Sequence, residues 1–158
     1  MIKQFKIDPW TCMPLLGTVE FFKLSDAGGH QADSMTRDGY QPVMENPIMW
    51  DHFADLKNAI AEILDRELSI NWEIHRSWFV SYNKGGWQDW HTHDNHNSLF
   101  SGVVCLIGSD NSGKLKFETG EEFYLTQGDV MLFDSTINHC AEQVTLPKTV
   151  LAFDVRQR

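Results

Sequence analysis

Three histidines have the residue type and the spacing of a metal site. His91 and His93 are separated by one residue, and His139 lies further along the chain. On an extended strand, residues two apart point to the same face, so His91 and His93 can direct two imidazoles to one point. If His139 lies on another strand, it can supply a third ligand. Neutral imidazole binds iron, copper, nickel and zinc, and three ligands leave coordination positions open for chemistry.

Two questions about this triad stay open at the level of sequence. Asp94 is an alternative to His93 as the second ligand, although it reaches the same face only if a bulge interrupts the strand. A His-x-His pair is also compatible with a solvated turn, in which case His139 is an ordinary surface residue. We favour His93. Asp89 and Asp134 are candidates to orient imidazole N–H groups through their carboxylates, although exposed loop carboxylates would look the same in sequence.

Short apolar runs predict the strands that must position these histidines. After Trp72 the runs are separated by Gly, Asn and Asp, and residues 114–118 alternate with period two, as a half-buried strand does. With no helix between them, the strands predict a mainly β fold, an antiparallel sandwich or jelly roll. The six predicted strands are 78–82, 100–107, 114–118, 122–125, 130–133 and 150–155.

We expect one or more supporting helices beside the roll, and the sequence pattern predicts one of them, packed on its outside. From 51 to 67 apolar residues recur at helical spacing, and Asp51 is positioned to cap the first turn. The first 46 residues mix short apolar pieces, 15–22 and 43–44, with a turn-rich polar segment at 25–29. We expect these pieces to be short strands or loops lying over the core.

The length and composition predict one domain. A chain of 158 residues with 42% hydrophobic residues can bury roughly two-thirds of its unfolded surface in one core. No repeat, linker or low-complexity tract divides it. We therefore expect a single domain over residues 1–158, with an N-terminal segment at 1–75 that contains the helix and a metal-binding β core at 76–158.

Charge and cysteine usage exclude several classes of partner. Thirteen Lys and Arg against 22 Asp and Glu give a net charge of −9, which disfavours binding to a phosphate backbone. No stretch approaches the ~18 consecutive apolar residues that span a bilayer, and the first residues lack the apolar core of a signal peptide. Cys12, Cys105 and Cys140 are few and far apart, as in a reducing compartment. We expect a soluble cytoplasmic protein without nucleic-acid or membrane partners.

Four segments resemble motifs of one enzyme superfamily. Residues 82–93, YNKGGWQDWHTH, resemble the Tyr-x-x-Gly-Gly-x-x-x-x-His-x-Asp segment of Fe(II)- and 2-oxoglutarate-dependent oxygenases of the prolyl hydroxylase type. Residues 112–117 look like the Gly-Gly-x-Leu-x-Phe strand of that superfamily, and 128–135 with His139 look like its Gly-Asp-x-x-x-Phe-x-Ser-x-x-x-His segment. Residues 148–153 begin with a lysine where the family has a basic residue opening the last core strand. The resemblance covers residues 78–155, and small oxygenases of bacteria and phages, with a Ser-Gly-Val strand like residues 101–103, are the most similar.

The resemblance implies a fold, two cofactors and a reaction. The fold would be a double-stranded β-helix with Fe(II) at its open end, held by His91 and His139. Lys148 would pair with the far carboxylate of 2-oxoglutarate, and Tyr82 would add a hydrogen bond to the same cosubstrate. The family's chemistry implies oxidative decarboxylation of 2-oxoglutarate to succinate and hydroxylation of a substrate. For a viral member, the cytoplasm would be that of the host.

The chain departs from the family pattern at the second ligand. The usual facial triad contains two histidines and one carboxylate, but His93 occupies the carboxylate position. Three neutral ligands would leave the iron with its full double charge, so the dianionic cosubstrate would still be attracted. Trp87 and Trp90 adjoin the pair and are candidates for contacts to a small-molecule or peptide substrate, although packing at the sheet rim is the commoner role of such residues.

Two other functions remain compatible with the sequence. Gly85, followed after five residues by His91-x-His93, matches the first half of the cupin motif, which implies a three-histidine dioxygenase or isomerase that does not use 2-oxoglutarate. Against that interpretation, the downstream Glu of the motif is absent, and residues 134–138 lack its Pro-x-Gly. The second alternative is a jelly-roll binding module that has lost catalysis. The oligomeric state and the substrate are left open.

Overall fold

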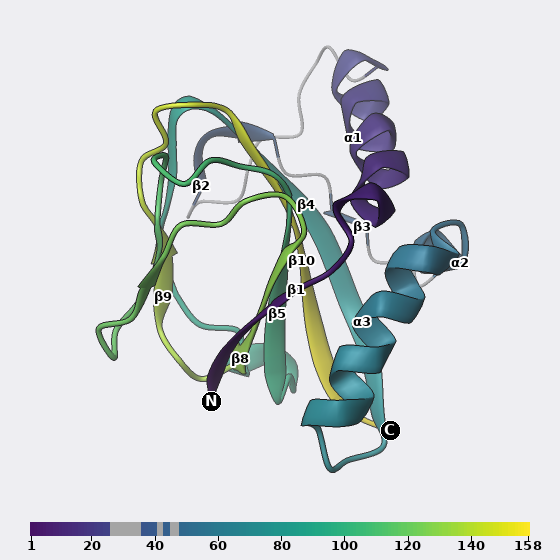
Figure 1. Cartoon of the computed structure of the whole chain (residues 1–158). Helices are drawn as coiled ribbons and strands as arrows, with labels where there is room; N and C mark the ends of the chain where they lie inside the picture. The colour runs from purple at the N-terminus through teal and green to yellow at the C-terminus, as the bar shows by residue number, and fades with distance from the viewer. Residues whose placement is uncertain (26–35, 41–42, 45–47) are drawn as a thin grey trace.

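The chain forms one antiparallel sheet that curls on itself, with helices along one side (Figure 1). The computed structural model describes residues 1–25, 36–40, 43–44 and 48–158. The helices are α1 (Met13–Ser25), α2 (Ile48–Asp51) and α3 (Ala54–Glu67), with short 3-10 turns at Pro9–Cys12 and Asp94–His96. The strands are β1 (Ile2–Lys6), β2 (Thr36–Tyr40), β3 (Val43–Met44), β4 (Trp72–His91), β5 (Phe100–Ile107), β6 (Leu115–Phe117), β7 (Glu122–Phe123), β8 (Asp129–Asp134), β9 (His139–Ala141) and β10 (Lys148–Gln157).

Strand β4 connects the two halves of the curled sheet. The order of strands is β1-β8-β5-β10-β4-β9-β6-β7, and β2 and β3 also pair with β4. Along its 20 residues β4 pairs first with β10, between Trp72 and Tyr82, and then with β9, at Gln88 and His91. The register with β9 is broken between Gln88 and His91, where a bulge bends the strand. The predicted mainly β jelly roll is confirmed.

The two faces of β10 pack into different cores. Leu151, Phe153 and Val155 belong to the core that also contains Leu15 of α1 and Ile60 of α3, and Figure 1 shows these helices on one side of the sheet. The alternate residues Val150 and Ala152 face the inside of the roll, where they pack with residues of β4 and β9. Because side chains alternate along a strand, β10 separates a helix-covered core from an inner pocket.

Helix α3 confirms the predicted helix, but its N-terminus differs from the prediction. The buried face consists of Leu56, Ile60, Ile63 and Leu64, with the expected spacing. Asp51 ends α2 instead of capping α3, and its carboxylate accepts from Lys57 at 2.5 Å. Phe53 precedes the first turn and provides no side-chain cap. Of the residues assigned to the predicted helix, only Asp51 lies in the short α2, and α3 begins three residues later at Ala54.

The prediction of strands or loops for 15–22 was wrong, because these residues lie in α1. Leu15 and Val19 are four residues apart and both are buried against the sheet, which is the period of a helix. Pro14 stands in the first turn, where its missing N–H costs nothing. A short apolar run can be helix or strand by pattern alone, and here packing decides. Val43–Met44 does form the short strand β3, and most of segment 25–29 lies outside the described residues.

Two further expectations from the sequence concern the cysteines and membrane-spanning helices. Cys12, Cys105 and Cys140 are buried free thiols. Burial raises the pKa of Cys105 to about 12, so this thiol is neutral and serves as packing. Within the described ranges, the helices are too short or too polar for any of them to cross a bilayer.

Candidate metal centre

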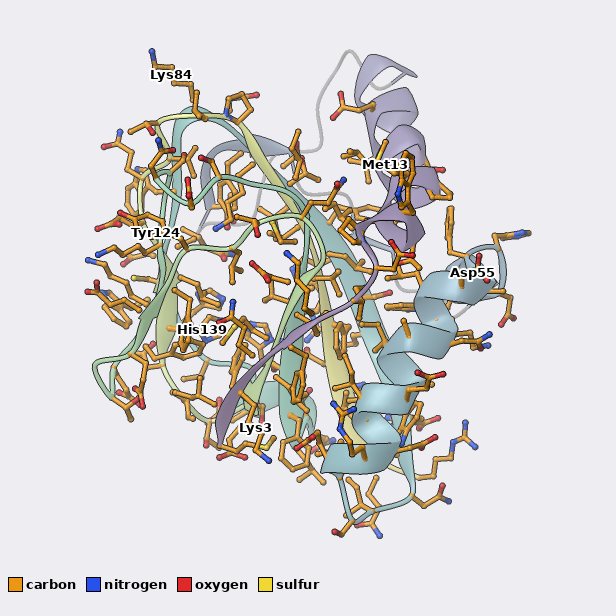
Figure 2. All side chains as sticks on the ribbon, in the orientation of Figure 1. Lys3, Met13, Asp55, Lys84, Tyr124 and His139 are labelled. Carbon is orange, nitrogen blue, oxygen red and sulfur yellow. The ribbon has the colours of Figure 1, made fainter. Side chains whose placement is uncertain are left out.

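The structure brings His91, His93 and His139 together. His91 is the last residue of β4 and His139 the first of β9, and the two are direct partners across these strands. The nearest ring nitrogens of the three histidines all lie within 4.8 Å of one another. Imidazole nitrogens bind first-row metals at about 2.0–2.1 Å, so a small movement of the side chains is enough for all three to reach one ion. Figure 2 labels His139 among the side chains that fill the roll.

His93 reaches the triad from beyond the end of the strand. β4 ends at His91, so the alternation of a strand does not by itself direct His93 inward. Its main-chain N–H donates to the carbonyl of Ser135 at 2.9 Å, which ties it to the turn between β8 and β9. Asp94, the alternative ligand, lies exposed in the following 3-10 turn and accepts from Thr92 Oγ1 at 2.7 Å. The geometry therefore favours His93.

The three rings are held in the orientation that a metal requires. Nδ1 of His91 lies 2.7 Å from the main-chain oxygen of Asp89, and Nδ1 of His139 lies 3.0 Å from that of Ile137. Nδ1 of His93 lies 2.7 Å from Oδ1 of Asp154. Carbonyl and carboxylate oxygens only accept, so each Nδ1 carries the proton. Each Nε2 then keeps its lone pair for a metal ion.

The expected carboxylates do not orient the histidines. Asp89 contributes its main-chain oxygen, whereas its carboxylate accepts from the main-chain N–H of Trp90. The carboxylate of Asp134 pairs with the N-terminal amino group, because β1 lies beside β8. The prediction for both side chains was therefore wrong. It overlooked that backbone carbonyls two residues earlier can serve as acceptors for His91 and His139.

The sequence analysis missed Asp154, although β10 carries a signal for it. This residue has 0% exposure, accepts from Ser101 Oγ at 2.8 Å and lies 3.3 Å from Nη1 of Arg76. Burial opposes its ionisation, but the hydrogen bonds from His93 and Ser101 and the nearby positive charge hold its carboxyl pKa below the usual value. Asp154 follows Lys148 by six residues on one strand, so both side chains face the inside.

The interior keeps His139 neutral. Burial, and then the charges of His91 and His93, lower the pKa of His139 to about 3. Its ring is also packed edge-on against Phe133, with centroids 4.7 Å apart. A neutral imidazole is the form that binds a metal, so the site needs no deprotonation of His139 at neutral pH.

A pocket of about 40 Å³ extends from the histidines into the roll, and its lining includes Tyr82, Gln88 and Lys148. Tyr82 and Lys148 are direct partners across β4 and β10, and the Tyr82 hydroxyl donates to Gln88 Oε1 at 3.3 Å. With about 3.3 Å per residue, Lys148 and Asp154 are roughly 20 Å apart along β10. The pocket occupies the stretch between them, over Val150 and Ala152.

Lys148 is a buried cation without an anionic partner among the described residues. It is 3% exposed, and its Nζ donates to the carbonyl of Gly113 at 3.0 Å. Burial lowers its pKa, because the charged form is poorly solvated. An unpaired buried charge is costly, and an anion entering the pocket would offset that cost. The donor set thus fits a ligand that carries a carboxylate at one end and oxygen ligands for a metal at the other.

The candidate substrate residues lie outside this pocket. Trp87 and Trp90 are 36% and 43% exposed, and both line a shallow groove beside the bulge of β4, together with Cys140 and Glu142. Trp78, which the sequence analysis did not single out, lines the pocket, and its ring centroid lies 5.2 Å from that of His93. The strand alternation that places Tyr82 inside also places Trp78 there.

Solved structures with the same fold include prolyl hydroxylases and a protein with 2-oxoglutarate bound. The chain is similar over 99% of its length to a prolyl-4-hydroxylase from Pseudomonas putida, of which it covers 92%, with a TM-score of 0.76 and 14% identity. It is similar to the viral collagen prolyl hydroxylase of Paramecium bursaria Chlorella virus-1, solved as a 2OG complex (99% and 96% covered, TM-score 0.75, 14% identity). HygX from Streptomyces hygroscopicus, with nickel and 2-oxoglutarate bound, also matches (99% and 82% covered, TM-score 0.70, 11% identity).

These similarities define the fold class. No protein-family model matches the sequence, and no curated protein matches it either. At 11–14% identity, the solved structures show a shared fold. The chain therefore has the jelly roll of prolyl 4-hydroxylases and 2OG-Fe(II) oxygenases, as the sequence motifs predict. Within that roll it carries a candidate metal site of three histidines.

Proposed function

We propose that the protein is a non-haem Fe(II)- and 2-oxoglutarate-dependent oxygenase that hydroxylates a small-molecule or peptide substrate. One observation carries the proposal. In a single pocket of this fold, three histidines that could hold a metal ion lie at one end, and at the other lies a buried lysine that has no anionic partner among the described residues. Such a pocket suits a metal together with a small dianion that binds the metal at one end and the lysine at the other.

His91, His93 and His139 would hold the iron through Nε2. Bound iron and 2-oxoglutarate would supply the oxidising chemistry together with dioxygen: one oxygen atom would enter the succinate that forms with carbon dioxide from the cosubstrate, and the other would hydroxylate a substrate C–H bond. The chain contributes orientation, because each ring is fixed by an acceptor on Nδ1. It also contributes charge, because three neutral ligands leave the metal fully positive towards an anionic cosubstrate.

Lys148 and Tyr82 would bind the far end of the cosubstrate. The Lys148 ammonium can exchange its hydrogen bond to the Gly113 carbonyl for a carboxylate, or keep it and bind both, since it has three N–H groups. The Tyr82 hydroxyl, now donating to Gln88, lies on the neighbouring strand at the same level. Apolar side chains of β10 and β6 line the space between, so water is excluded from this end.

The test is an anaerobic titration of the Fe(II)-loaded protein with 2-oxoglutarate. We expect a saturable visible charge-transfer band, which reports chelation of the metal by the cosubstrate. In a Lys148→Met variant, saturation should require about 100-fold more 2-oxoglutarate, as expected when a buried charge pair is lost. Lys84→Met is the matched control, since Lys84 projects from the rim of the roll (Figure 2) and should leave the titration unchanged. No band in iron-loaded protein would overturn the proposal.

A three-histidine metal enzyme that does not use 2-oxoglutarate is the second candidate. The observation that favours it is the ligand set itself, because His93 takes the place of the carboxylate of a facial triad. In this case iron binds, no charge-transfer band forms, and Lys148→Met leaves turnover unchanged. A binding module without catalysis would instead purify without stoichiometric metal, and a chelator would leave its thermal stability unchanged.

A further inference from the structure

Asp154 is a carboxylate in contact with His93 that does not belong to the candidate ligand set. Its Oδ1 lies 2.7 Å from Nδ1 of His93 and accepts from Ser101 Oγ at 2.8 Å, and its Oδ2 lies 3.3 Å from Nη1 of Arg76. The carboxylate is entirely buried. Three partners therefore surround both of its oxygens and fix its orientation.

The acceptor on His93 differs in charge from the acceptors on the other two histidines. His91 and His139 donate to main-chain carbonyls, which are neutral, whereas His93 donates to a carboxylate. Either acceptor selects the tautomer with the proton on Nδ1. A carboxylate also draws that proton towards itself, which makes the opposite nitrogen more electron-rich and a stronger metal ligand.

The strands on both sides of β10 hold the Asp154 carboxylate in a fixed position. Arg76 faces Asp154 directly across β4 and β10, and its guanidinium stacks 5.3 Å over the ring of Trp78. Ser101 faces Asp154 from β5, on the other side of β10. Neighbouring strands on both sides thus hold the carboxylate, while the cation of Arg76 sits on the oxygen remote from His93 and leaves Oδ1 for the imidazole.

We propose that Asp154 is a positioning residue that gives His93 the character of an anionic ligand. The negative charge that a carboxylate ligand would place on the metal is placed one group further out, on the far side of the His93 ring. The inference rests on the proposed metal site, and it explains how a three-histidine centre can approach the charge of a two-histidine, one-carboxylate centre.

The test measures binding of Co²⁺ alone to the metal-free protein, without 2-oxoglutarate or turnover. For Asp154→Asn, which retains the shape of the side chain, we expect Co²⁺ affinity to fall by about 10- to 100-fold, the usual effect of losing an outer-shell carboxylate. The visible spectrum of bound Co²⁺ should shift as well. Asp129→Asn is the matched control, because Asp129 is a buried carboxylate on β8 that bonds Thr126 and Lys6, and it should leave the affinity unchanged.

A second measurement uses the unaltered chain and so does not depend on the folding of a variant. Side-chain ¹⁵N NMR of the metal-free protein should show His93 with its proton on Nδ1 and with that proton strongly deshielded by the carboxylate, the resonance being assigned with His93→Gln. Protonation on Nε2 instead would overturn the proposal. A folded Asp154→Asn protein with Co²⁺ affinity within about twofold of the wild type would also overturn it. If the wild type itself binds no Co²⁺, the metal site and this inference both fail.

Discussion

The two ends of the pocket are built in different ways. At the metal end, His91 at the end of β4 and His93 just beyond it converge with His139 from β9, and each has its own acceptor that orients it. At the other end a single ammonium, that of Lys148, is held by one carbonyl and by the pairing of β10 with β4. The metal end is therefore preorganised by several contacts, whereas the lysine end depends on one side chain whose charge has no anionic partner among the described residues. Substitutions at the metal end should therefore change metal affinity and acid stability, whereas substitutions at the lysine end should change cosubstrate affinity and stability at neutral pH.

The largest effect is expected at the metal end. His139→Ala removes a ligand, so the affinity for Co²⁺ should fall by more than about 100-fold, beyond the usual cost of losing an outer contact. Isothermal titration calorimetry on metal-free protein measures this directly. His96→Ala provides the control, because His96 is exposed in the turn that follows the site. Equal affinities of His139→Ala and wild type would show that the triad is not the metal centre.

At the lysine end, replacing the charged side chain by an apolar one should stabilise the fold. Lys148→Met removes an unpaired buried charge and fills the same space with an apolar chain, so the free energy of unfolding should rise by about 1–2 kcal/mol. Because burial lowers the pKa of Lys148, the wild type regains stability as pH rises through that lowered pKa towards about 10.4. Urea denaturation at neutral and high pH should therefore show that the difference in unfolding free energy between Lys148→Met and the wild type becomes smaller as pH rises. A loss of stability in the variant at neutral pH would contradict the assignment of an uncompensated charge.

The metal end should instead make the metal-free protein sensitive to acid. The pKa of His139 is about 3 in the folded chain and about 6.5 when unfolded, so the unfolded state takes up its proton first as pH falls. Stability is fully present above pH ~6.5 and is lost below it, by about 1.5 kcal/mol between pH 6.5 and 5. Urea midpoints in the presence of a chelator measure the loss. The urea midpoint of His139→Gln should fall less steeply with decreasing pH than that of the wild type. An equally steep fall would assign the acid sensitivity to other groups.

The smallest effect is expected for Tyr82, the second polar side chain at the lysine end. Tyr82→Phe keeps the ring in the core and removes one hydroxyl, which is worth about 0.5–1.5 kcal/mol. The affinity for 2-oxoglutarate should therefore fall by about 2- to 10-fold, with Co²⁺ affinity unchanged. Tyr124→Phe, at an exposed position outside the pocket, should change neither. A cosubstrate affinity identical to the wild type would place Tyr82 among the packing residues.

The regular β segments were the most predictable part of the fold. Residues 100–107 were predicted as a strand and form β5 with the same bounds, in the part of the chain where several short apolar runs follow one another between turn residues. Strand β4 is much longer than the predicted 78–82, since it continues through Gly85 and Gly86 to reach β9. Glycines mark turns in a sequence, but here they lie in the strand, and only the pairing partners show that it continues.

The candidate ligands were predictable, but the manner of their convergence was not. Residue type and spacing singled out His91, His93 and His139, and the motif likeness singled out Lys148. The direction of His93, however, depends on a hydrogen bond to Ser135 and on Asp154, which is 61 residues away in the chain. Contacts of this range are created when strands pair, so no local pattern contains them.

The sequence by itself determined which chemical groups are available: three imidazoles, one lysine on a core strand, and alternating apolar residues that can form a roll. The tertiary structure decided their relations. It placed a carboxylate of β10 behind His93, excluded Asp89 and Asp134 from that role, and left Lys148 without a carboxylate partner among the described residues. The physical reason is that local periodicity sets the face on which a side chain lies, whereas strand pairing over long separations sets what that face meets.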